Sequence, residues 1–477
     1  VALETVRARH TAVRIEPLDE QESSLLVQQL LKIDDLPPNV RDLITNKAEG
    51  NPFYIEEVVR SLIDRGAVEL RDGRFCVTEK IETAVIPGTV QEVIMSRVDR
   101  LHEPTRHLLQ VASVVGRDFY FKIIADIVRR QGESDEDLPA HFEVLKEKQL
   151  LLERRGRGGW AVSVGDRGVG EELEYIFKHA LAQQTIYESL LQKTRRQFHA
   201  IVAQSIESMF AERLNDFYGM LAHHHARAEN LVKAEDYLFK AGEEATRSAA
   251  SREALKFFQE AVRIYEKLHG DGGDPRRRAA LEKNIGLALL NTGKLTDSIG
   301  HFDGALALLR YGESSTALGT WLQFLRDFAA VLFHLYFRSD RMRTLTASET
   351  ERECFQIVGS RTKALSTSDP KRLFFGMFGG IRRLNRIDPR TIEDATAFYV
   401  MASGLFSYSG TSFAIARRFV EVAKKSVQSG NLKDEVASRT AEFLIAYLEG
   451  QWDDRYTLGD ALLQQAVRQG LLWDVQS

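Results

Sequence analysis

The sequence predicts a mainly α-helical protein with three parts: a small helical subdomain, a winged-helix subdomain with a β-hairpin wing, and a TPR-like α-helical superhelix. Apolar residues recur every three to four positions along most of the chain, as on one face of a helix. Only 10 prolines occur in 477 residues, which also favours helix. Two short apolar runs, at 150–152 and 173–177, flank a stretch rich in glycine and arginine, which indicates a hairpin with a long tip.

Length and composition limit the function classes. A chain of 477 residues is about three times a typical domain, so we expect two to four structural units. Lys and Arg total 64 and Asp and Glu total 68, which argues against a protein that coats nucleic acid or anionic membranes by bulk charge. No apolar run approaches the roughly 18 residues of a membrane span. Two distant cysteines, Cys76 and Cys354, provide no disulfide framework, so we expect a cytoplasmic protein.

The first 86 residues predict a short strand and then a helical subdomain. Apolar and polar residues alternate over residues 1–17, and Pro17 ends this strand. Within the subdomain, residues 18–86, we expect a helix with an acidic first turn after Leu18, a second after Pro37-Pro38, and a third over 53–63. Residues 67–77 predict a hairpin that turns at Asp72-Gly73.

Residues 87–192 predict the winged-helix domain. Amphipathic helices are expected at 89–101 and 105–115, with Gly116 as the C-cap of the second, and two more helices contain 123–128 and 142–145. A two-stranded ribbon, 150–152 with 173–177, then encloses the glycine-rich tip. Helices followed by such a ribbon is the order of elements in a winged helix.

Residues 193–477 predict TPR-like helical repeats. The second helix of such a repeat needs a small–x3–large–x2–small pattern, because small residues let neighbouring helices approach. This pattern occurs three times, as Ala234, Leu238 and Ala241; as Ala254, Phe258 and Ala261; and as Ser298, Phe302 and Ala305. The helix before the last copy has Ile285, Gly286 and Leu289 at positions typical of the first helix of a repeat. Ala446-Tyr447 with Gly450-Gln451-Trp452 predicts another helix–turn–helix junction. Such arrays usually bind protein on a concave surface.

The sequence contains no complete catalytic apparatus, so we assign no catalytic residue. A G-x-x-x-x-G-K-[ST] phosphate loop and a G-x-S-x-G nucleophile elbow are both missing from the 477 residues. His223-His224-His225 lie on a predicted helix, where consecutive side chains point about 100° apart and cannot all face one metal ion. We therefore predict no metal site. The arginines of the predicted wing are followed by three glutamates, so a solvated hairpin is favoured over a contact with nucleic acid.

Gly50-Asn51-Pro52 suits a junction between two helices. Glycine can end one helix, asparagine can cap the next, and proline is favoured in a first turn. The local pattern thus explains itself structurally, and His179 likewise suits a residue that begins a helix after a strand.

Five runs in the same order resemble a known family. They are Lys47–Val59 (KAEGNPFYIEEVV), Ile86–Gln91 (IPGTVQ), Ala112–Phe119 (ASVVGRDF), Tyr175–Leu181 (YIFKHAL) and Tyr187–Leu190 (YESL). They are similar to the region after the nucleotide-binding core of bacterial STAND ATPases, the signal-transduction ATPases with numerous domains. Relatives of this kind carry a class III adenylate/guanylate cyclase domain, an AAA-like ATPase module and TPR-like repeats. The resemblance covers residues 1 to about 270 and extends to the remainder in general character.

The resemblance implies a role for four residues in nucleotide binding. Gly50, Asn51 and Pro52 match the family's GxP motif, whose proline packs near the adenine in the ADP-bound state. His179 lies where a nucleotide-sensing histidine of the winged-helix subdomain approaches the β-phosphate. The phosphate loop and the magnesium-binding acid are expected upstream of Val1, and residues 1–17 as the last strand of that missing core. ATP or ADP, with Mg²⁺, is therefore expected in the full-length parent, and no cofactor in this chain alone.

The resemblance implies the regulatory and sensor portion of an ATPase that couples nucleotide state to a protein partner or small effector at the repeats. Its further partners would be the missing ATPase domain and, where present, an upstream cyclase that it controls; membrane and nucleic acid are not expected. The parent would be an ATPase, whereas no catalytic activity is expected from this chain alone. Two alternatives stay open: a STAND-type transcriptional regulator that binds DNA through a winged helix or a missing terminal domain, and a plain TPR scaffold.

Overall fold

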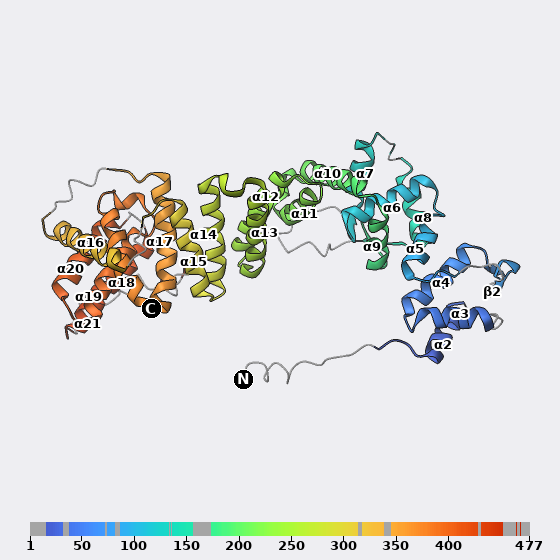
Figure 1. Ribbon diagram of the computed structural model, residues 1–477, viewed down its shortest axis with the longest axis horizontal. Coiled ribbons are helices and arrows are strands. Elements are labelled where there is room, and N and C mark those ends of the chain that lie inside the picture. Colours follow the sequence, from blue (N-terminus) through green and yellow to red (C-terminus); the bar gives the residue numbers. More distant parts are fainter. Residues whose placement is uncertain are drawn as a thin grey trace. The chain divides into compact units, whose positions relative to one another are not determined.

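The computed structural model describes residues 16–31, 38–71, 74–81, 86–132, 134, 136–155, 173–312, 317–337, 345–427, 431–451, 464 and 468. The chain is mainly α-helical, as predicted, with two small sheets among these residues (Figure 1). It consists of two compact units, Val1–Asn230 and Leu231–Ser477. Nearly all of the predicted strand at 1–17 and the whole wing tip lie outside the described residues. The predicted boundaries at 86/87 and 192/193 stay predictions.

The first unit begins with three helices and a hairpin, at the places that the sequence predicts. The helices are α2 (Glu20–Leu31), α3 (Pro38–Ala48) and α4 (Pro52–Asp64). They enclose a core that includes Val27, Ile44 and Ile55. Two strands, β1 (Val68–Arg71) and β2 (Arg74–Val77), pair in antiparallel register, with Val68 opposite Val77, and η1 (Glu79–Ile81) follows.

A second group of helices surrounds a three-stranded sheet. Its elements are α5 (Val90–Val98), α6 (Glu103–Val115), β3 (Asp118–Tyr120), α7 (Phe121–Arg130), α8 (Leu138–Glu147), β4 (Leu151–Arg155), β5 (Leu173–Phe177) and α9 (Ala180–Ser189). The strand order is β3-β5-β4, all antiparallel, so β5 is the central strand. Gly116 is the C-cap of α6, as predicted, and its φ of 149° is a value that residues with a side chain rarely adopt.

The prediction of a two-stranded ribbon is wrong, because β3 pairs with β5 as a third strand. Only three residues form β3, and α7 follows it directly. So short a strand contains too few residues for an alternating pattern to appear in the sequence. The predicted pairing of 150–152 with 173–177 is confirmed, since Leu151 lies opposite Phe177.

The first unit ends with α10 (Gln192–Met209), η2 (Ala211–Phe217) and α11 (Tyr218–Arg227). In the second unit, helical hairpins follow one another along the chain (Figure 1). The first four helices are α12 (Leu231–Arg247), α13 (Ser251–His269), α14 (Pro275–Asn291) and α15 (Leu295–Leu308), with η3 (Gly270–Gly272) between α13 and α14. This succession of paired helices is the predicted TPR-like arrangement.

A buried phenylalanine and a facing glycine join the two helices in the hairpins α12–α13 and α14–α15. Phe258 of α13 packs on Gly242 of α12, and a Cβ at Gly242 would lie 2.5 Å from the Phe258 ring. Phe302 of α15 packs on Gly286 of α14 in the same way, with 2.6 Å for the corresponding distance. Both phenylalanines are fully buried, so the small–large–small pattern is confirmed on α13 and α15.

The copy of that pattern at 234–241 lies on the first helix of its hairpin. Ala234, Leu238 and Ala241 lie on α12, the first helix of its hairpin, and not on a second helix. All three are buried, because α12 packs on α13 with one of its faces. A small–large–small spacing therefore identifies a closely packed helix without telling which member of the pair it is.

The rest of the second unit packs around an aromatic core that includes Phe324, Phe378 and Phe419. Its elements are α16 (Ala317–Phe337), α17 (Glu349–Ser368), α18 (Pro370–Leu384), η5 (Pro389–Thr391), α19 (Ala395–Tyr408), α20 (Phe413–Ser426) and α21 (Leu432–Leu448). Gly450 follows α21 with φ 77°, and the helix predicted after Trp452 lies outside the described residues except for residues 464 and 468, which are helical.

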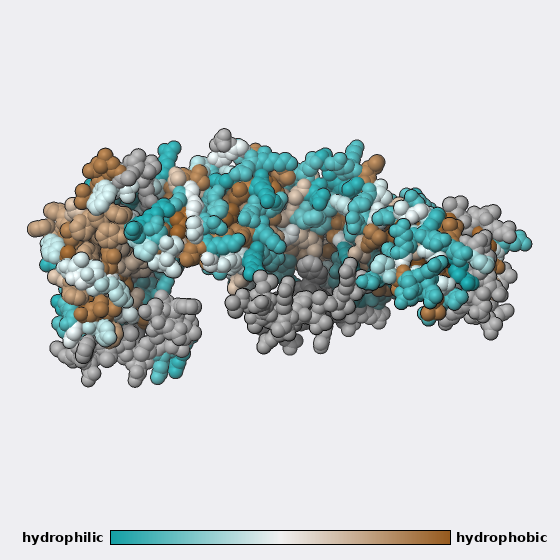
Figure 2. Space-filling model, turned by 60° about the horizontal axis from the view of Figure 1, so that its bottom comes forward, coloured by the Kyte–Doolittle hydropathy of each residue, from teal (hydrophilic) through white to brown (hydrophobic). Residues whose placement is uncertain are grey.

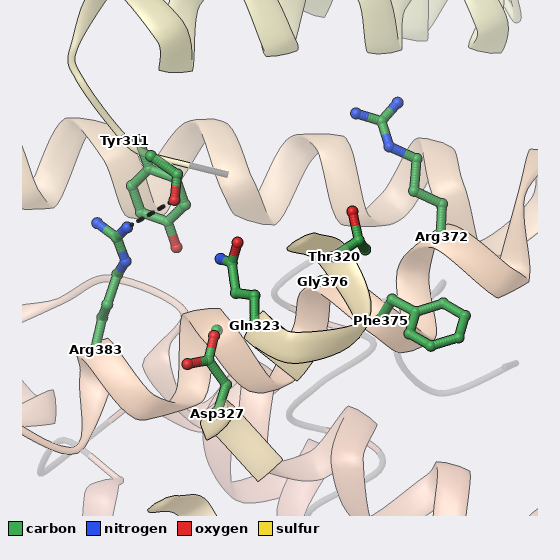
Figure 3. A pocket seen from close by; sticks show the side chains of 10 residues that line it. Tyr311, Thr320, Gln323, Asp327, Arg372, Phe375, Gly376 and Arg383 are labelled. Atoms are coloured by element: carbon green, nitrogen blue, oxygen red, sulfur yellow. Dashed lines mark hydrogen bonds between the residues drawn. The ribbon is translucent and has the colours of Figure 1, made fainter. Parts of the chain in front are cut away.

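Two surface features belong to α16. Large apolar side chains lie exposed along it; they are Leu318, Trp321, Leu322, Leu325, Phe333 and Phe337. Figure 2 shows hydrophobic surface, in brown, on the C-terminal part of the second unit. Between α16 and α18 lies a cavity of about 280 Å³ (Figure 3). Within the part of the chain that the structure describes, no helix is long and apolar enough to cross a membrane.

Candidate functional site at the start of α4

The N-terminus of α4 is capped by the residue that the sequence singles out. Asn51 Oδ1 accepts hydrogen bonds from the backbone N–H groups of Phe53 (3.0 Å) and Tyr54 (3.4 Å). Pro52 occupies the first helical position, where no intrahelical N–H bond is required. The local interpretation of Asn51 and Pro52 as helix-start residues is confirmed, while their role toward a nucleotide stays a prediction.

Gly50 is fixed by both its backbone and its surroundings. Its φ is 73°, in the left-handed region that side chains rarely adopt. Its carbonyl oxygen accepts the N–H of Leu18 at 2.9 Å, and a Cβ at position 50 would lie 2.3 Å from the Leu18 oxygen. The chain entering α2 is therefore held against the turn between α3 and α4, and only glycine fits there.

His179 lies beside this helix start, although it is far away in the sequence. It follows β5 and is the N-cap residue of α9, without a capping hydrogen bond from its side chain. Its ring centroid is 4.1 Å from that of Phe53, the residue after Pro52, and the rings are tilted by 41°. The structure thus brings the Gly50-Asn51-Pro52 segment and His179 to one place.

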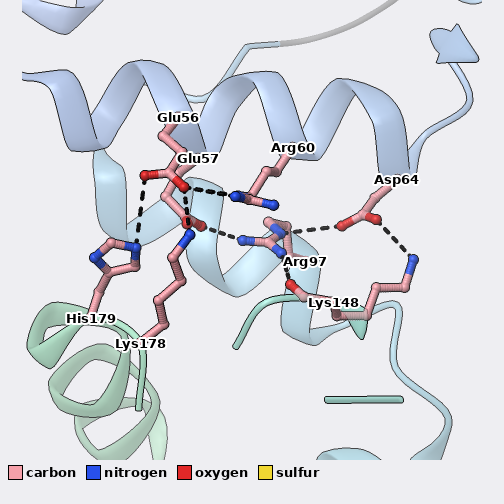
Figure 4. Close-up of polar contacts among 8 residues, drawn as sticks. All are labelled: Glu56, Glu57, Arg60, Asp64, Arg97, Lys148, Lys178 and His179. Atoms are coloured by element: carbon pink, nitrogen blue, oxygen red, sulfur yellow. Dashed lines mark hydrogen bonds and ion pairs between the residues drawn. The ribbon is translucent and has the colours of Figure 1, made fainter. Parts of the chain in front are cut away.

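Glu56 connects α4 to the same chain segment. Its Oε1 pairs with Lys178 Nζ at 2.6 Å and with Arg60 at 2.7 Å, and Figure 4 shows these contacts with His179 beside them. Burial alone would raise the pKa of Glu56, but the hydrogen bonds from Lys178 and Arg60 outweigh it and lower the pKa to about 2. Glu56 therefore stays ionised at every physiological pH.

His179 is favoured in its neutral form. Burial lowers its pKa below the ordinary value, and this outweighs the opposing attraction of Glu56 and Glu57. Its Nε2 atom is buried, lies 3.9 Å from Glu56 Oε2, and has no hydrogen-bond partner among the described residues. A neutral imidazole in this position can donate or accept one hydrogen bond that the described residues do not supply.

A second set of ion pairs lies further along α4. Arg97 of α5 is buried and pairs with Glu57 at 2.5 Å and with Asp64 at 3.2 Å. It also donates to the Lys148 carbonyl at 2.5 Å, and the Lys148 ammonium pairs with Asp64 at 2.8 Å (Figure 4). Removing one partner of such a buried pair commonly costs about 3–5 kcal/mol, because the other charge stays buried.

This ion-pair set was missed at the sequence level. The available signal is Glu57, which stands four residues after Phe53 on the apolar face of α4 and is buried. An acidic residue in the middle of an apolar helix face predicts a buried cationic partner. The partner, Arg97, could not be chosen among the arginines of the following helices without a structure.

The segment before α5 is tied to the same helices. Tyr54 donates its hydroxyl hydrogen to the Pro87 carbonyl at 2.6 Å, and Lys47 donates to the Ile86 carbonyl at the same distance. Burial, with a smaller effect of Glu92, raises the pKa of Tyr54 to about 12, so the hydroxyl stays protonated as donor. Two of the sequence runs that carry the family resemblance therefore lie in direct contact.

The three consecutive histidines of α11 lie elsewhere in the first unit, where two of them contact His199 and the third contacts Glu207. His224 Nδ1 is 2.8 Å from His199 Nδ1, whereas His225 Nε2 is 3.0 Å from Glu207. The His223 ring meets His199 edge-on at 5.7 Å. Among the described residues, no group of three or more His, Cys, Asp or Glu side chains is arranged to hold a metal ion.

Two comparisons by sequence concern parts of the chain. The family model described as "Domain of unknown function (DUF8739)" matches residues 19–75, which include α2, α3, α4 and β1. An uncharacterized protein of Rhizobium meliloti (strain 1021) is 24% identical over 260 residues, which are 54% of this chain and 23% of that protein. The match thus spans less than a quarter of the length of that relative.

A comparison with solved structures finds a signal-transduction ATPase. The crystal structure of a STAND protein with a tetratricopeptide repeat sensor from Pyrococcus horikoshii aligns with 98% of this chain and 74% of its own. Its sequence identity is 11% and the TM-score is 0.29.

Proposed function

We propose that the chain is the regulatory and sensor portion of a signal-transduction ATPase. In this proposal the helical hairpins of the second unit bind a protein partner or small effector, and the start of α4 responds to an adenine nucleotide. The observation that carries the proposal is the contact between Phe53 and His179, because it joins the Gly50-Asn51-Pro52 segment to the one histidine that the family resemblance implicates.

The residues at this place fit part of a nucleotide. His179 Nε2 lacks a hydrogen-bond partner among the described residues and could donate to a phosphate oxygen. Pro52 is exposed and offers apolar surface to a base. Lys178 provides the nearest cation, although Glu56 neutralises it. ATP and ADP differ in the phosphate charge that they would present to these residues. A phosphate loop and Mg²⁺ would belong to another part of the parent.

The order of elements supports a winged-helix subdomain in residues 87–192. Helix α6, the short strand β3, helices α7 and α8, and then β4 and β5 follow one another, and β5 lies between the other two strands. We propose that this subdomain presents His179 to the nucleotide. The output of the parent, in this proposal, includes a nucleotide cyclase where that domain precedes the ATPase.

The test measures ADP affinity of the full-length parent with His179→Ala and Pro52→Ala. A lost hydrogen bond to a charged phosphate should weaken binding about tenfold or more. His107→Ala and Pro104→Ala are matched controls, since His107 also contacts an aromatic ring, that of Phe198, and Pro104 also stands in the first turn of a helix. Unchanged ADP affinity in both test variants would refute the nucleotide roles of His179 and Pro52.

A further inference from the structure

The cavity between α16 and α18 lies in the second unit, which the proposed function describes as the sensor of a partner or small effector. It has a volume of about 280 Å³, at the small end of ligand pockets and closer to a metabolite than to a peptide. Figure 3 shows side chains from both helices and from the segment after α15 around it. The lining residues whose chemistry matters most are Tyr311, Gln323, Asp327, Arg372, Phe375 and Arg383.

Glycines on α18 keep the cavity open. Gly376 and Gly379 line it, one turn apart, although glycine has a lower helix propensity than alanine. A Cβ at Gly379 would lie 3.1 Å from Asp327, whereas one at Gly376 would meet nothing closer than 3.9 Å, the distance to Arg361. Packing therefore does not require glycine at position 376, and a side chain there would project into free space.

Arg383 has no ion-pair partner among the described residues and contacts the segment after α15 instead. Its guanidinium lies over the Tyr311 ring at 3.8 Å and donates one hydrogen bond, 3.3 Å long, to the Gly312 carbonyl (Figure 3). Within the described ranges, no carboxylate forms an ion pair with it. Since a guanidinium has five N–H groups, most of its donors are left for another acceptor.

The surroundings of the cavity add to this positive charge. Asp327 pairs with both Arg326 and Arg382, and Asp303 pairs with both Arg361 and Arg372. Of these charged residues, Arg372 and Asp327 line the cavity, so with Arg383 two arginines stand against one aspartate there. The planar guanidinium of Arg383 can donate several hydrogen bonds at once, which suits a carboxylate or a phosphate group.

We propose that this cavity binds a small organic anion, with its carboxylate or phosphate group on Arg383 and its apolar part against Phe375. The further claim that this anion is the ligand sensed by the second unit rests on the proposed function. As a binding site, the cavity can be tested by itself.

The experiment uses isothermal titration calorimetry on the 477-residue chain at low ionic strength. Phenyl phosphate and benzoate are the two anionic probes, and benzyl alcohol is the neutral analogue. We expect one or both anions to bind and benzyl alcohol not to bind. The stronger of the two anions then tells whether phosphate or carboxylate is preferred.

Three variants locate the binding. Arg383→Gln should weaken anion binding about tenfold or more. Gly376→Leu should abolish it by filling the cavity, while circular dichroism shows the helix content retained. Arg418→Gln is the matched control, because Arg418 also lies over a tyrosine ring, that of Tyr336 at 4.0 Å, and donates to a backbone carbonyl, but does not line the cavity.

The proposal is overturned if neither anion binds, if benzyl alcohol binds equally well, or if Arg418→Gln weakens binding as much as Arg383→Gln. It can fail separately from the proposed function. Anion binding that leaves the nucleotide affinity of the full-length parent unchanged would confirm the site and refute its sensing role. Absence of anion binding would leave the test of His179 and Pro52 unaffected.

Discussion

Among single residues, Gly50 has the most restrictive environment of the candidate site. We predict that Gly50→Ala destabilises the first unit by at least about 3 kcal/mol, since left-handed strain of about 1–2 kcal/mol is joined by a clash with Leu18. Gly132→Ala is the matched control, because Gly132 also has positive φ, 82°, but a Cβ there would meet nothing within 4 Å. Denaturant unfolding followed by circular dichroism measures both. Equal losses would mean that the contact with Leu18 contributes nothing.

The buried histidines of the first unit make its stability depend on pH. His199 Nε2 lies 3.0 Å from the Tyr187 hydroxyl and its Nδ1 2.8 Å from His224. Burial, with smaller effects of His223, Arg227 and Arg195, lowers the pKa of His199 to about 3, and burial lowers that of His224 well below 6.5. The folded form therefore binds fewer protons than the unfolded chain between pH 6.5 and about 3.

Stability should accordingly be complete above pH 6.5 and decline as the pH falls toward 3, by up to about 1.4 kcal/mol per pH unit for each histidine involved. We predict a shallower decline for His199→Gln than for the wild type. The measurement is urea unfolding at several pH values, and the slope against pH is compared rather than the stability itself. A slope that is unchanged in His199→Gln would contradict the prediction.

Local residue chemistry could be predicted from the sequence where neighbours in the chain determine it. The cap formed by Asn51 and the first-turn proline belong to this class, because their partners lie two or three residues away. The neighbour of His224 could not be predicted, because His199 comes from the preceding long helix. The triplet at 223–225 shows only that the three side chains diverge, not where each one finds a partner.

At the scale of elements, the hairpin of α14 and α15 depends on close approach at Gly286. We predict that Gly286→Ala destabilises the second unit by about 1–3 kcal/mol, because its Cβ would lie 2.6 Å from the Phe302 ring. Gly300→Ala, on α15 itself, has open space and should stabilise by up to about 1 kcal/mol through helix propensity. Thermal unfolding distinguishes the two. Adding Phe302→Leu to Gly286→Ala should recover part of the loss, and no recovery would argue against the clash.

Long elements with strong periodicity could be predicted, whereas short ones could not. The helices around Gly50-Asn51-Pro52 and the hairpin at 67–77 occur where apolar spacing and turn residues indicate them. The strand β3 has three residues and owes its existence to pairing with β5, a partner more than fifty positions later in the chain. Such a strand is defined by tertiary contacts and not by its own sequence.

For the molecule as a whole, we predict two unfolding transitions. Each unit contains its own buried core, one around Ile44 and Ile55 and one around Phe324 and Phe378. Gly50→Ala should therefore lower the midpoint of one calorimetric transition and Gly286→Ala that of the other, by about 2–4 °C per kcal/mol for units of this size. A single transition that both variants shift equally would show that the units unfold together.

The contacts that α4 makes with later segments of the first unit share one helix face. Phe53, Glu56, Glu57 and Asp64 recur at helical spacing, so their contacts with His179, Lys178, Arg97 and Lys148 lie along one face of one helix. Backbone bonds from Phe177 to Arg117 and from Lys178 to Leu150 hold the residues before His179 on both sides. The backbone before His179 is thus tied to two other segments, whereas Phe53 belongs to α4. Because one helix makes all four contacts, a displacement of α4 as a rigid rod would break them together.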